Sequence, residues 1–209
     1  MVRLTIAAAL VLLIAGPAFT QNLLTNPGFD DADQLAGWTC NTIHGDLTWS
    51  SEDRSGSTTS GSMQHDLTAA SNNLDLSCSQ CVPITEFNGY VASMWYFWPN
   101  DVDVAQDGSS RITIVFYSDA GCNVVAEYGP FDIGFFPGRP LDTWLQLKTD
   151  EGLAPAGSVA ALVTIVTWQD LADEPVRARI DDIVLVAVIP IFSDDFESGG
   201  IGAWSSSVP

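Results

Sequence analysis

The chain has 209 residues and a formal net charge of −19, with 26 acidic residues against 7 Lys and Arg. Such an excess of negative charge repels nucleic acid and anionic lipid, so the composition argues against either as a partner. An acidic surface suits solubility, divalent cations and neutral ligands such as sugars.

Residues 1–21 are predicted to be a signal peptide. Arg3 gives a positive start, Leu4–Ile14 is apolar apart from one threonine, and Ala18–Thr20 offers a cleavage site before the mature chain. The apolar run is too short to span a bilayer comfortably, and no later run reaches about 18 apolar residues. We therefore expect a secreted protein, extracellular or at the cell surface, without membrane insertion.

Four cysteines are present, and an even number in an exported chain favours disulfides. Of the three possible pairings, we prefer Cys40–Cys78 with Cys81–Cys122. This choice ties the first strand region to a central one, and two central segments to each other. Cys78 and Cys81 form a C-x-x-C, but a second such pair, a suitable histidine pair and a following helix are missing, which argues against a redox or metal motif.

The pattern along the chain predicts an all-β protein. Short segments with period-two alternation of apolar residues are bounded by Gly, Asn, Asp, Ser or Pro. The candidate strands are Asn22–Leu24, Gly37–Asn41, Asp46–Ser50, Gly61–Leu67, Leu74–Pro83, Gly89–Trp98, Arg111–Ser118, Asn123–Gly129, Trp144–Thr149, Ser158–Trp168 and Arg177–Val188. Many short strands with turn-rich connections favour a two-sheet antiparallel β-sandwich.

Three further features refine this expectation. Ser158–Trp168 is apolar on both faces, which predicts a central strand covered on both sides. Residues 50–60, 100–110 and 130–141 are predicted to be long loops, and helical turns are expected only at 31–35 and 169–173. One domain is expected over residues 22–189, followed by a tail at 190–209 whose Phe, acidic and Trp residues echo the opening.

Four motifs occur in a suggestive order: "NLLTNPGFD…GW", "SGSM", "CVPI…GYVASMW" and "ARIDDIVLV". In this order they resemble the jelly-roll carbohydrate-binding modules of the cellulose- and xylan-binding type, within the galactose-binding-like group. The resemblance covers Asn22 to Val188. It implies a jelly-roll sandwich in which the N-terminal strand lies near the C-terminal strand. The tail resembles a short C-terminal segment of exported proteobacterial proteins.

The resemblance also implies a structural calcium ion, Ca²⁺, where the two ends of the domain meet. Asp30 stands where the family usually has glutamate, and Asp181 matches the C-terminal aspartate of the family. Converging carboxylates repel each other, and a hard cation that takes several oxygen ligands relieves this repulsion. The alternative is that Asp30 caps a turn and Asp181 is solvated.

The sequence shows no catalytic constellation, so we expect no enzymatic activity. It has no G-x-S-x-G, H-E-x-x-H, Walker loop or G-x-G-x-x-G. His44 and His65 lie among polar residues and are predicted to be surface histidines. The Asp101–Gly108 segment departs from the calcium-loop pattern and is predicted to be a solvated loop. Among 26 acidic residues, no pair of carboxylates is marked as a glycosidase pair.

Aromatic residues carry the binding hypothesis, because a flat ring matches the apolar C–H face of a sugar. Alternate residues of Gly89–Trp98 share a face: Tyr90, Ala92, Met94, Tyr96 and Trp98 on one, and Val91, Ser93, Trp95 and Phe97 on the other. We predict that the Trp95 face binds ligand, with Trp49 and Trp168 as further candidates. Trp38 and Trp144 are predicted to pack in the core or at a sheet edge.

The sequence therefore predicts a secreted, noncatalytic module that binds a polysaccharide or a cell-surface glycan by aromatic stacking. The alternative is a structural or adhesive extracellular sandwich without a sugar site.

Overall fold

The structure, a computed structural model, describes residues 21–30, 34–67, 73–100, 108–135, 140–170 and 175–188. Within these ranges the chain forms eleven strands and no helix. The strands are β1 (Thr39–Asn41), β2 (Gly45–Ser50), β3 (Ser62–Leu67), β4 (Leu74–Pro83), β5 (Gly89–Phe97), β6 (Gly108–Tyr117), β7 (Val125–Phe135), β8 (Trp144–Lys148), β9 (Gly152–Leu153), β10 (Ala160–Gln169) and β11 (Val176–Val188). The predicted signal peptide up to residue 20, the predicted tail and residues 101–107 of a predicted loop lie outside the described residues, as do residues 31–33 and 171–173 of the two predicted helical turns.

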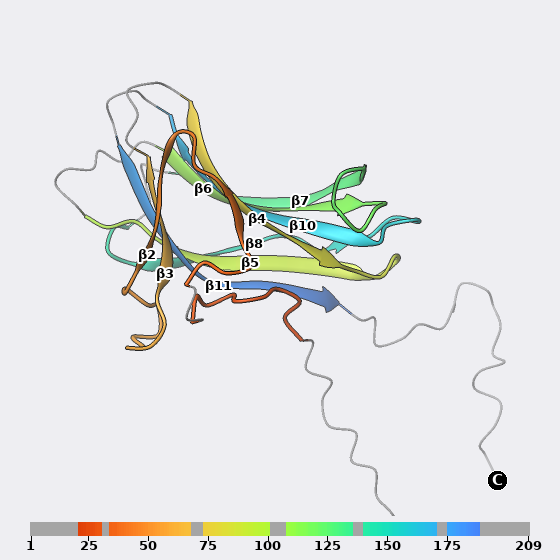
Figure 1. Ribbon diagram of the computed structural model, residues 1–209, viewed down its shortest axis with the longest axis horizontal. Helices are drawn as coiled ribbons and strands as arrows, with labels where there is room; N and C mark the ends of the chain where they lie inside the picture. The colour runs from red at the N-terminus through yellow and green to blue at the C-terminus, as the bar shows by residue number, and fades with distance from the viewer. Residues whose placement is uncertain are drawn as a thin grey trace, which may run out of the picture.

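The strands form two stacked antiparallel sheets, which confirms the predicted sandwich (Figure 1). One sheet has five strands in the order β1-β4-β10-β6-β7, and the other has six, in which β2-β3-β11-β5-β8 are consecutive and β9 pairs with β5. Across the described ranges, no helix has the length and apolar character needed to cross a membrane.

The core lies between the sheets and is built by strict alternation. In β5, Tyr90, Ala92, Met94 and Tyr96 are at most 2% exposed, whereas Trp95 between them is half-buried and faces outward. Across the core, β5 meets β6 of the opposite sheet, and β10 meets β11 and β3. Burying each large apolar side chain contributes about 1.5–3 kcal/mol, so the two inner faces hold the sheets together.

Three boundary predictions were wrong. β6 begins at Gly108, inside the segment 100–110 that was predicted to be a loop. β7 continues to Phe135, although residues 130–141 were predicted to be a loop. Pro130 cannot donate to the ladder, but the register shifts between Thr113 and Val115 of β6, and pairing resumes at Phe131 beyond this bulge. At the N-terminus, residues 22–24 form no strand; β9 was not predicted.

The beginning and the end of the domain nevertheless lie side by side, as the resemblance implied. The backbone N–H of Leu23 donates to the carbonyl of Leu185 at 2.9 Å, and that of Ile183 donates to Pro27 at 2.9 Å. The Asn22 side chain donates to Ile183 O and accepts from Leu185 N. β11 changes register between Asp181 and Val184, and the N-terminal segment satisfies its backbone groups there.

Both predicted disulfides are confirmed. Cys40–Cys78 joins directly opposed residues of β1 and β4, with a Cα–Cα distance of 4.1 Å. Cys81–Cys122 joins β4 to the turn after β6, with a Cα–Cα distance of 6.1 Å. Within the described residues no cysteine is free.

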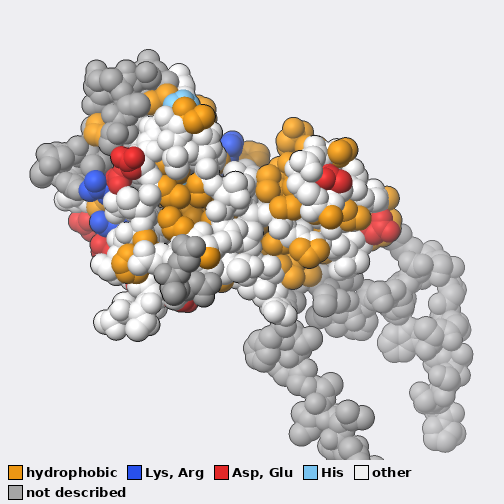
Figure 2. All heavy atoms as spheres, in the orientation of Figure 1, with side chains coloured by type: hydrophobic (Ala, Val, Ile, Leu, Met, Phe, Trp, Pro, Cys, Tyr) orange, Lys and Arg blue, Asp and Glu red, His pale blue; other side chains and the backbone are white. Residues whose placement is uncertain are grey.

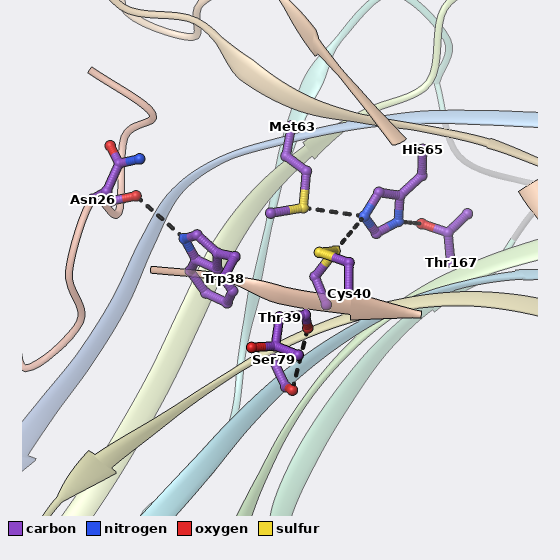
Figure 3. Close-up of a disulfide and its surroundings, with 9 residues drawn as sticks. Asn26, Trp38, Thr39, Cys40, Met63, His65, Ser79 and Thr167 are labelled. Atoms are coloured by element: carbon purple, nitrogen blue, oxygen red, sulfur yellow. Dashed lines mark hydrogen bonds between the residues drawn. A yellow bond between two sulfur atoms is a disulfide. The ribbon is translucent and has the colours of Figure 1, made fainter. Parts of the chain in front are cut away.

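His65 is fully buried, so its prediction as a surface histidine was wrong. It lies on β3 with its ring pointing into the sandwich beside the first disulfide (Figure 3). Its Nδ1 lies 2.8 Å from the Thr167 hydroxyl, and its Nε2 lies 3.1 Å from the Met63 sulfur and 3.6 Å from the Cys78 sulfur. Burial lowers the pKa of His65 to about 3, because these neighbours cannot replace water around a charged ring.

The free energy of unfolding should therefore decrease as the pH falls, because His65 takes up a proton more readily in the unfolded chain than in the folded one. Between pH 6.5 and pH 3 the unfolded state binds the His65 proton and the folded state does not, so unfolding is favoured as the pH falls. The contribution is fully present above pH 6.5 and decreases by up to about 1.4 kcal/mol per pH unit below it. We expect His65→Gln to remove this slope in urea unfolding between pH 4 and pH 7.

The comparison must be made as a difference between wild type and variant. Burial raises the pKa of Asp181 to about 7, so that group contributes a slope of opposite sign, which both proteins share and the subtraction removes. His44→Gln, which changes a partly exposed histidine, is the matched control. Identical pH profiles for wild type and His65→Gln would contradict the prediction.

Candidate functional site

The outer face of the five-stranded sheet carries rows of apolar and aromatic side chains in register. In one row, Trp168 of β10, Ser109 of β6 and Phe135 of β7 are opposite one another. The next row on the same face holds Val166, Arg111 and Ile133, and the row after it Thr164, Thr113 and Phe131. Adjacent strands lie about 4.8 Å apart, so each row presents a nearly continuous surface.

The edge strand β7 leaves its aromatic rings open to solvent. Tyr128 is 77% exposed, Phe131 61% and Phe135 58%. Phe131, Ile133 and Phe135 alternate along the strand and so point to one side of the sheet. Large apolar side chains gathered at an edge in this way mark an interaction surface rather than a packing surface.

Two adjacent hollows run along this face. The first, of about 240 Å³, is lined by Ser109, Arg111, Ile133, Phe135, Val166, Trp168 and Asp170. The second, of about 430 Å³, is lined by Arg111, Thr113, Ile114, Val115, Tyr128, Gly129 and Phe131. Arg111 borders both hollows and therefore stands where they meet. We call the surface formed by Trp168, Arg111, Tyr128, Phe131 and Phe135 the aromatic groove.

The aromatic groove accounts for the unusual composition of β10. The prediction that this strand is covered on both sides holds only in part: on its outer face Ala160 and Val166 are buried, whereas Leu162, Thr164 and Trp168 are half-buried. The strand is central in its sheet, as expected, but its outer apolar side chains form the floor of the groove.

Of the three predicted ligand-binding tryptophans, only Trp168 lies in the aromatic groove. Trp95 lies on the outer face of the other sheet, where the Arg54 guanidinium carbon is 4.7 Å from the centroid of its ring. Arg54 also pairs with Asp182, so one face of the Trp95 indole is covered by an anchored side chain. A ligand role for Trp95 stays a prediction; Trp95 and Arg54 together line a hollow of about 300 Å³ on that face.

The position of the Trp49 ring is fixed by its contacts with neighbouring segments. Its indole Nε1 donates to the Phe29 carbonyl at 3.4 Å, and a β-carbon added to Gly61 would come within 2.5 Å of its ring. Glycine at position 61 therefore makes room for the ring. Trp38 and Trp144 pack as predicted: Trp38 lies against the core and Trp144 against Phe97, with ring centroids 5.3 Å apart.

The acidic residues at the two ends of the domain approach one another. A β-carbon added to Gly28 would lie 3.2 Å from Asp30 Oδ2 and 3.7 Å from Asp182 Oδ1. Both carboxylates therefore border the backbone at Gly28. Asp181 is 1% exposed and accepts hydrogen bonds from the backbone N–H groups of Arg54 and Asp182, at 3.0 and 2.7 Å. Among the described residues, no three His, Cys, Asp or Glu side chains form a ready-made metal site.

Sequence reasoning missed Arg111, Tyr128, Phe131 and Phe135. The signal for the two phenylalanines was the alternation in "FDIGF", which Pro130 and the surrounding glycines made look like a loop. Arg111 carried no local signal, because its importance depends on which strands lie beside β6.

No protein-family model matches the sequence, and no curated protein matches it. Solved structures do match. TmCBM61, solved with β-1,4-galactotriose, aligns with a TM-score of 0.53 at 13% identity, over 81% of this chain and 100% of its own. A carbohydrate-binding module of the β-sandwich superfamily aligns with a TM-score of 0.54 at 11% identity, over 73% of this chain and 58% of its own.

Some similar structures belong to glycoside hydrolases. The arabinose-bound α-L-arabinofuranosidase MgGH51 aligns with a TM-score of 0.56 at 16% identity, over 79% of this chain. This chain corresponds to only 26% of the arabinofuranosidase. At these identities the likeness shows the fold, which is the jelly-roll sandwich found in carbohydrate-binding modules.

Proposed function

We propose that this protein is a secreted, noncatalytic module that binds a polysaccharide along the aromatic groove. The observation that carries the proposal is the open row of rings on β7 beside Trp168, on the outer face of a sheet and next to two hollows. Sugar rings have apolar C–H faces, and burying them on flat aromatic rings is favourable.

The dimensions of the groove suit a chain rather than a single sugar. Phe131 and Phe135 are four residues apart on β7, which corresponds to about 13 Å along a strand. Trp168 lies across β6 from Phe135, about 10 Å away by strand spacing. Hydroxyls of Ser109 and Thr113 lie between the rings and offer hydrogen bonds that would orient the sugar.

Two further observations support the proposal. TmCBM61 shares the fold and was solved with β-1,4-galactotriose. Two disulfides are typical of proteins that function outside the cytoplasm, which fits the predicted signal peptide.

The test is binding of the mature protein to a panel of polysaccharides by affinity gel electrophoresis, with release of reducing ends measured in parallel. Retardation by at least one polysaccharide without release of reducing ends supports a noncatalytic module. Release of sugars would show an enzyme instead. A folded protein that no polysaccharide retards would favour the structural or adhesive alternative.

We also propose that Ca²⁺ binds where the two ends of the domain meet. Carboxylate oxygens of Asp30, Asp181 and Asp182 are the donors that this ion prefers. The Arg54 guanidinium already neutralises Asp182 and would compete with the ion. The positions of Asp30 and Asp182 beside Gly28 support the proposal.

Calcium at 100 times its dissociation constant should stabilise the fold by about 2.7 kcal/mol, seen as a higher melting temperature in calorimetry. Arg54→Gln should strengthen this response, because it removes the competing cation. An equal amount of Mg²⁺ is the control for ionic strength. An unchanged melting temperature in millimolar Ca²⁺ for both proteins would argue against the ion.

A further inference from the structure

The aromatic groove contains a cation whose charge has no partner in the described protein. Five Lys and Arg side chains lie in the described ranges. Arg54, Arg177 and Arg179 each pair with a carboxylate, and Lys148 is exposed on β8. Arg111 differs from all of these, because it is half-buried and its Nε is shielded from solvent without a hydrogen-bond partner among the described residues.

An unpaired, partly desolvated guanidinium is unfavourable unless something else supplies the counter-charge. The chain has 26 acidic residues from which a partner could have come. Asp170 lines the same hollow but makes no ion pair with Arg111 within the described part of the chain. Basic side chains are also few on the face that Figure 2 shows, where hydrophobic side chains gather in patches.

The surroundings of Arg111 would strengthen its attraction for an anion. Its neighbours in register are Val166 on β10 and Ile133 on β7, so its stem lies between apolar side chains. Electrostatic attraction is stronger where water is excluded. The row on one side offers Trp168 and Phe135, and the row on the other side offers Phe131, so rings lie on both sides of the guanidinium.

We propose that the aromatic groove selects acidic glycans, with Arg111 binding the carboxylate of a uronic acid while the neighbouring rings stack on the sugar chain. This inference rests on the proposed function and specifies its ligand class. The planar guanidinium donates two parallel hydrogen bonds to a carboxylate, a geometry that a neutral hydroxymethyl group cannot match. General charge attraction does not explain such selectivity, because a protein with net charge −19 repels a polyanion.

The experiment compares two forms of one polymer backbone. Binding of the mature protein to polygalacturonate and to its fully methyl-esterified form is measured by isothermal titration calorimetry, with a chelator present so that Ca²⁺ cannot bridge protein and polymer. We expect wild type to bind the acidic form about 10- to 100-fold more tightly, the range expected for a charge-assisted hydrogen-bond pair.

Arg111→Gln should remove this preference and bind both forms with similar affinity. Lys148→Gln is the matched control, because it removes one positive charge from the other sheet and should keep the preference. Arg111→Lys keeps the charge without the planar fork and should retain only part of the preference. Circular dichroism and a melting curve for each variant establish that it is folded.

Three outcomes are informative. Preference for polygalacturonate in wild type and Lys148→Gln, lost in Arg111→Gln, supports the proposal. Equal binding of both forms by wild type, or an unchanged preference in Arg111→Gln, overturns the acidic-glycan inference and leaves the proposed function standing. If the acidic form, the ester and the neutral polysaccharides all fail to bind, the proposed function itself fails.

Discussion

Replacing Trp168 by alanine should weaken polysaccharide binding by roughly 30-fold or more, equivalent to about 2 kcal/mol, the loss typical of an aromatic hot spot. Trp168 is half-buried on the outer face of β10, so the core between the sheets should be preserved. We expect the melting temperature to fall by no more than about 2–4 °C, which corresponds to about 1 kcal/mol in a domain of this size. Titration calorimetry and differential scanning calorimetry measure the two effects separately.

Trp95→Ala is the matched control, because it removes the same side chain from the outer face of the other sheet. If the groove holds the ligand, Trp95→Ala should bind like wild type. Loss of binding in Trp95→Ala with normal binding in Trp168→Ala would place the ligand beside Arg54 and restore the site first predicted from the sequence. A large fall in stability for Trp168→Ala would assign that ring to packing.

Removing either disulfide should destabilise the fold by about 4 kcal/mol, because the two bridges close loops of similar length, with sequence separations of 38 and 41 residues. In a domain of this size that loss lowers the melting temperature by about 10 °C. Two double variants test this expectation. One combines Cys40→Ala with Cys78→Ala, and the other combines Cys81→Ala with Cys122→Ala. Urea unfolding monitored by tryptophan fluorescence gives both free energies.

The two double variants should nevertheless differ. Cys78 is fully buried beside His65, whereas Cys81 is exposed. Because loop length is nearly matched, the loss of packed sulfur should make the first variant less stable than the second by about 1 kcal/mol. Equal stability of the two variants would show that packing around Cys78 contributes little.

Much of the fold could be predicted because alternation is a local property of the chain. The limits of β4 were predicted to the residue, Leu74–Pro83, since apolar and polar side chains alternate from Leu74 to Ser79 and Pro83 ends the run. The disulfide pairing preferred from the sequence, one of three possible, is the one that the structure shows. The N-terminal segment was placed correctly beside β11, although it bonds through the Asn22 side chain and a few peptide groups rather than as a strand.

The aromatic groove could not be predicted, because it depends on which strands are neighbours. Trp168 gains a site only because β6 and β7 bring Arg111 and Phe135 beside it from the middle of the chain. The alternation of bulky residues along Gly89–Trp98 favoured Trp95, and nothing near it in sequence indicated that Arg54 would lie over its ring. His65 shows the same limit, since polar neighbours along β3 face outward while the histidine itself faces the core.

The central position of β11 has a consequence for how the protein is made. β11 lies between β3 and β5, and it is the last strand of the described chain to leave the ribosome. The β2-β3 pair and the β5-β8 pair cannot join into one sheet until β11 lies between them. The hydrogen-bond partners of the Asn22 side chain likewise lie 161 and 163 residues later in the chain. Contacts between such distant residues form slowly. We therefore expect the six-stranded sheet to be completed only after β11 has been synthesised.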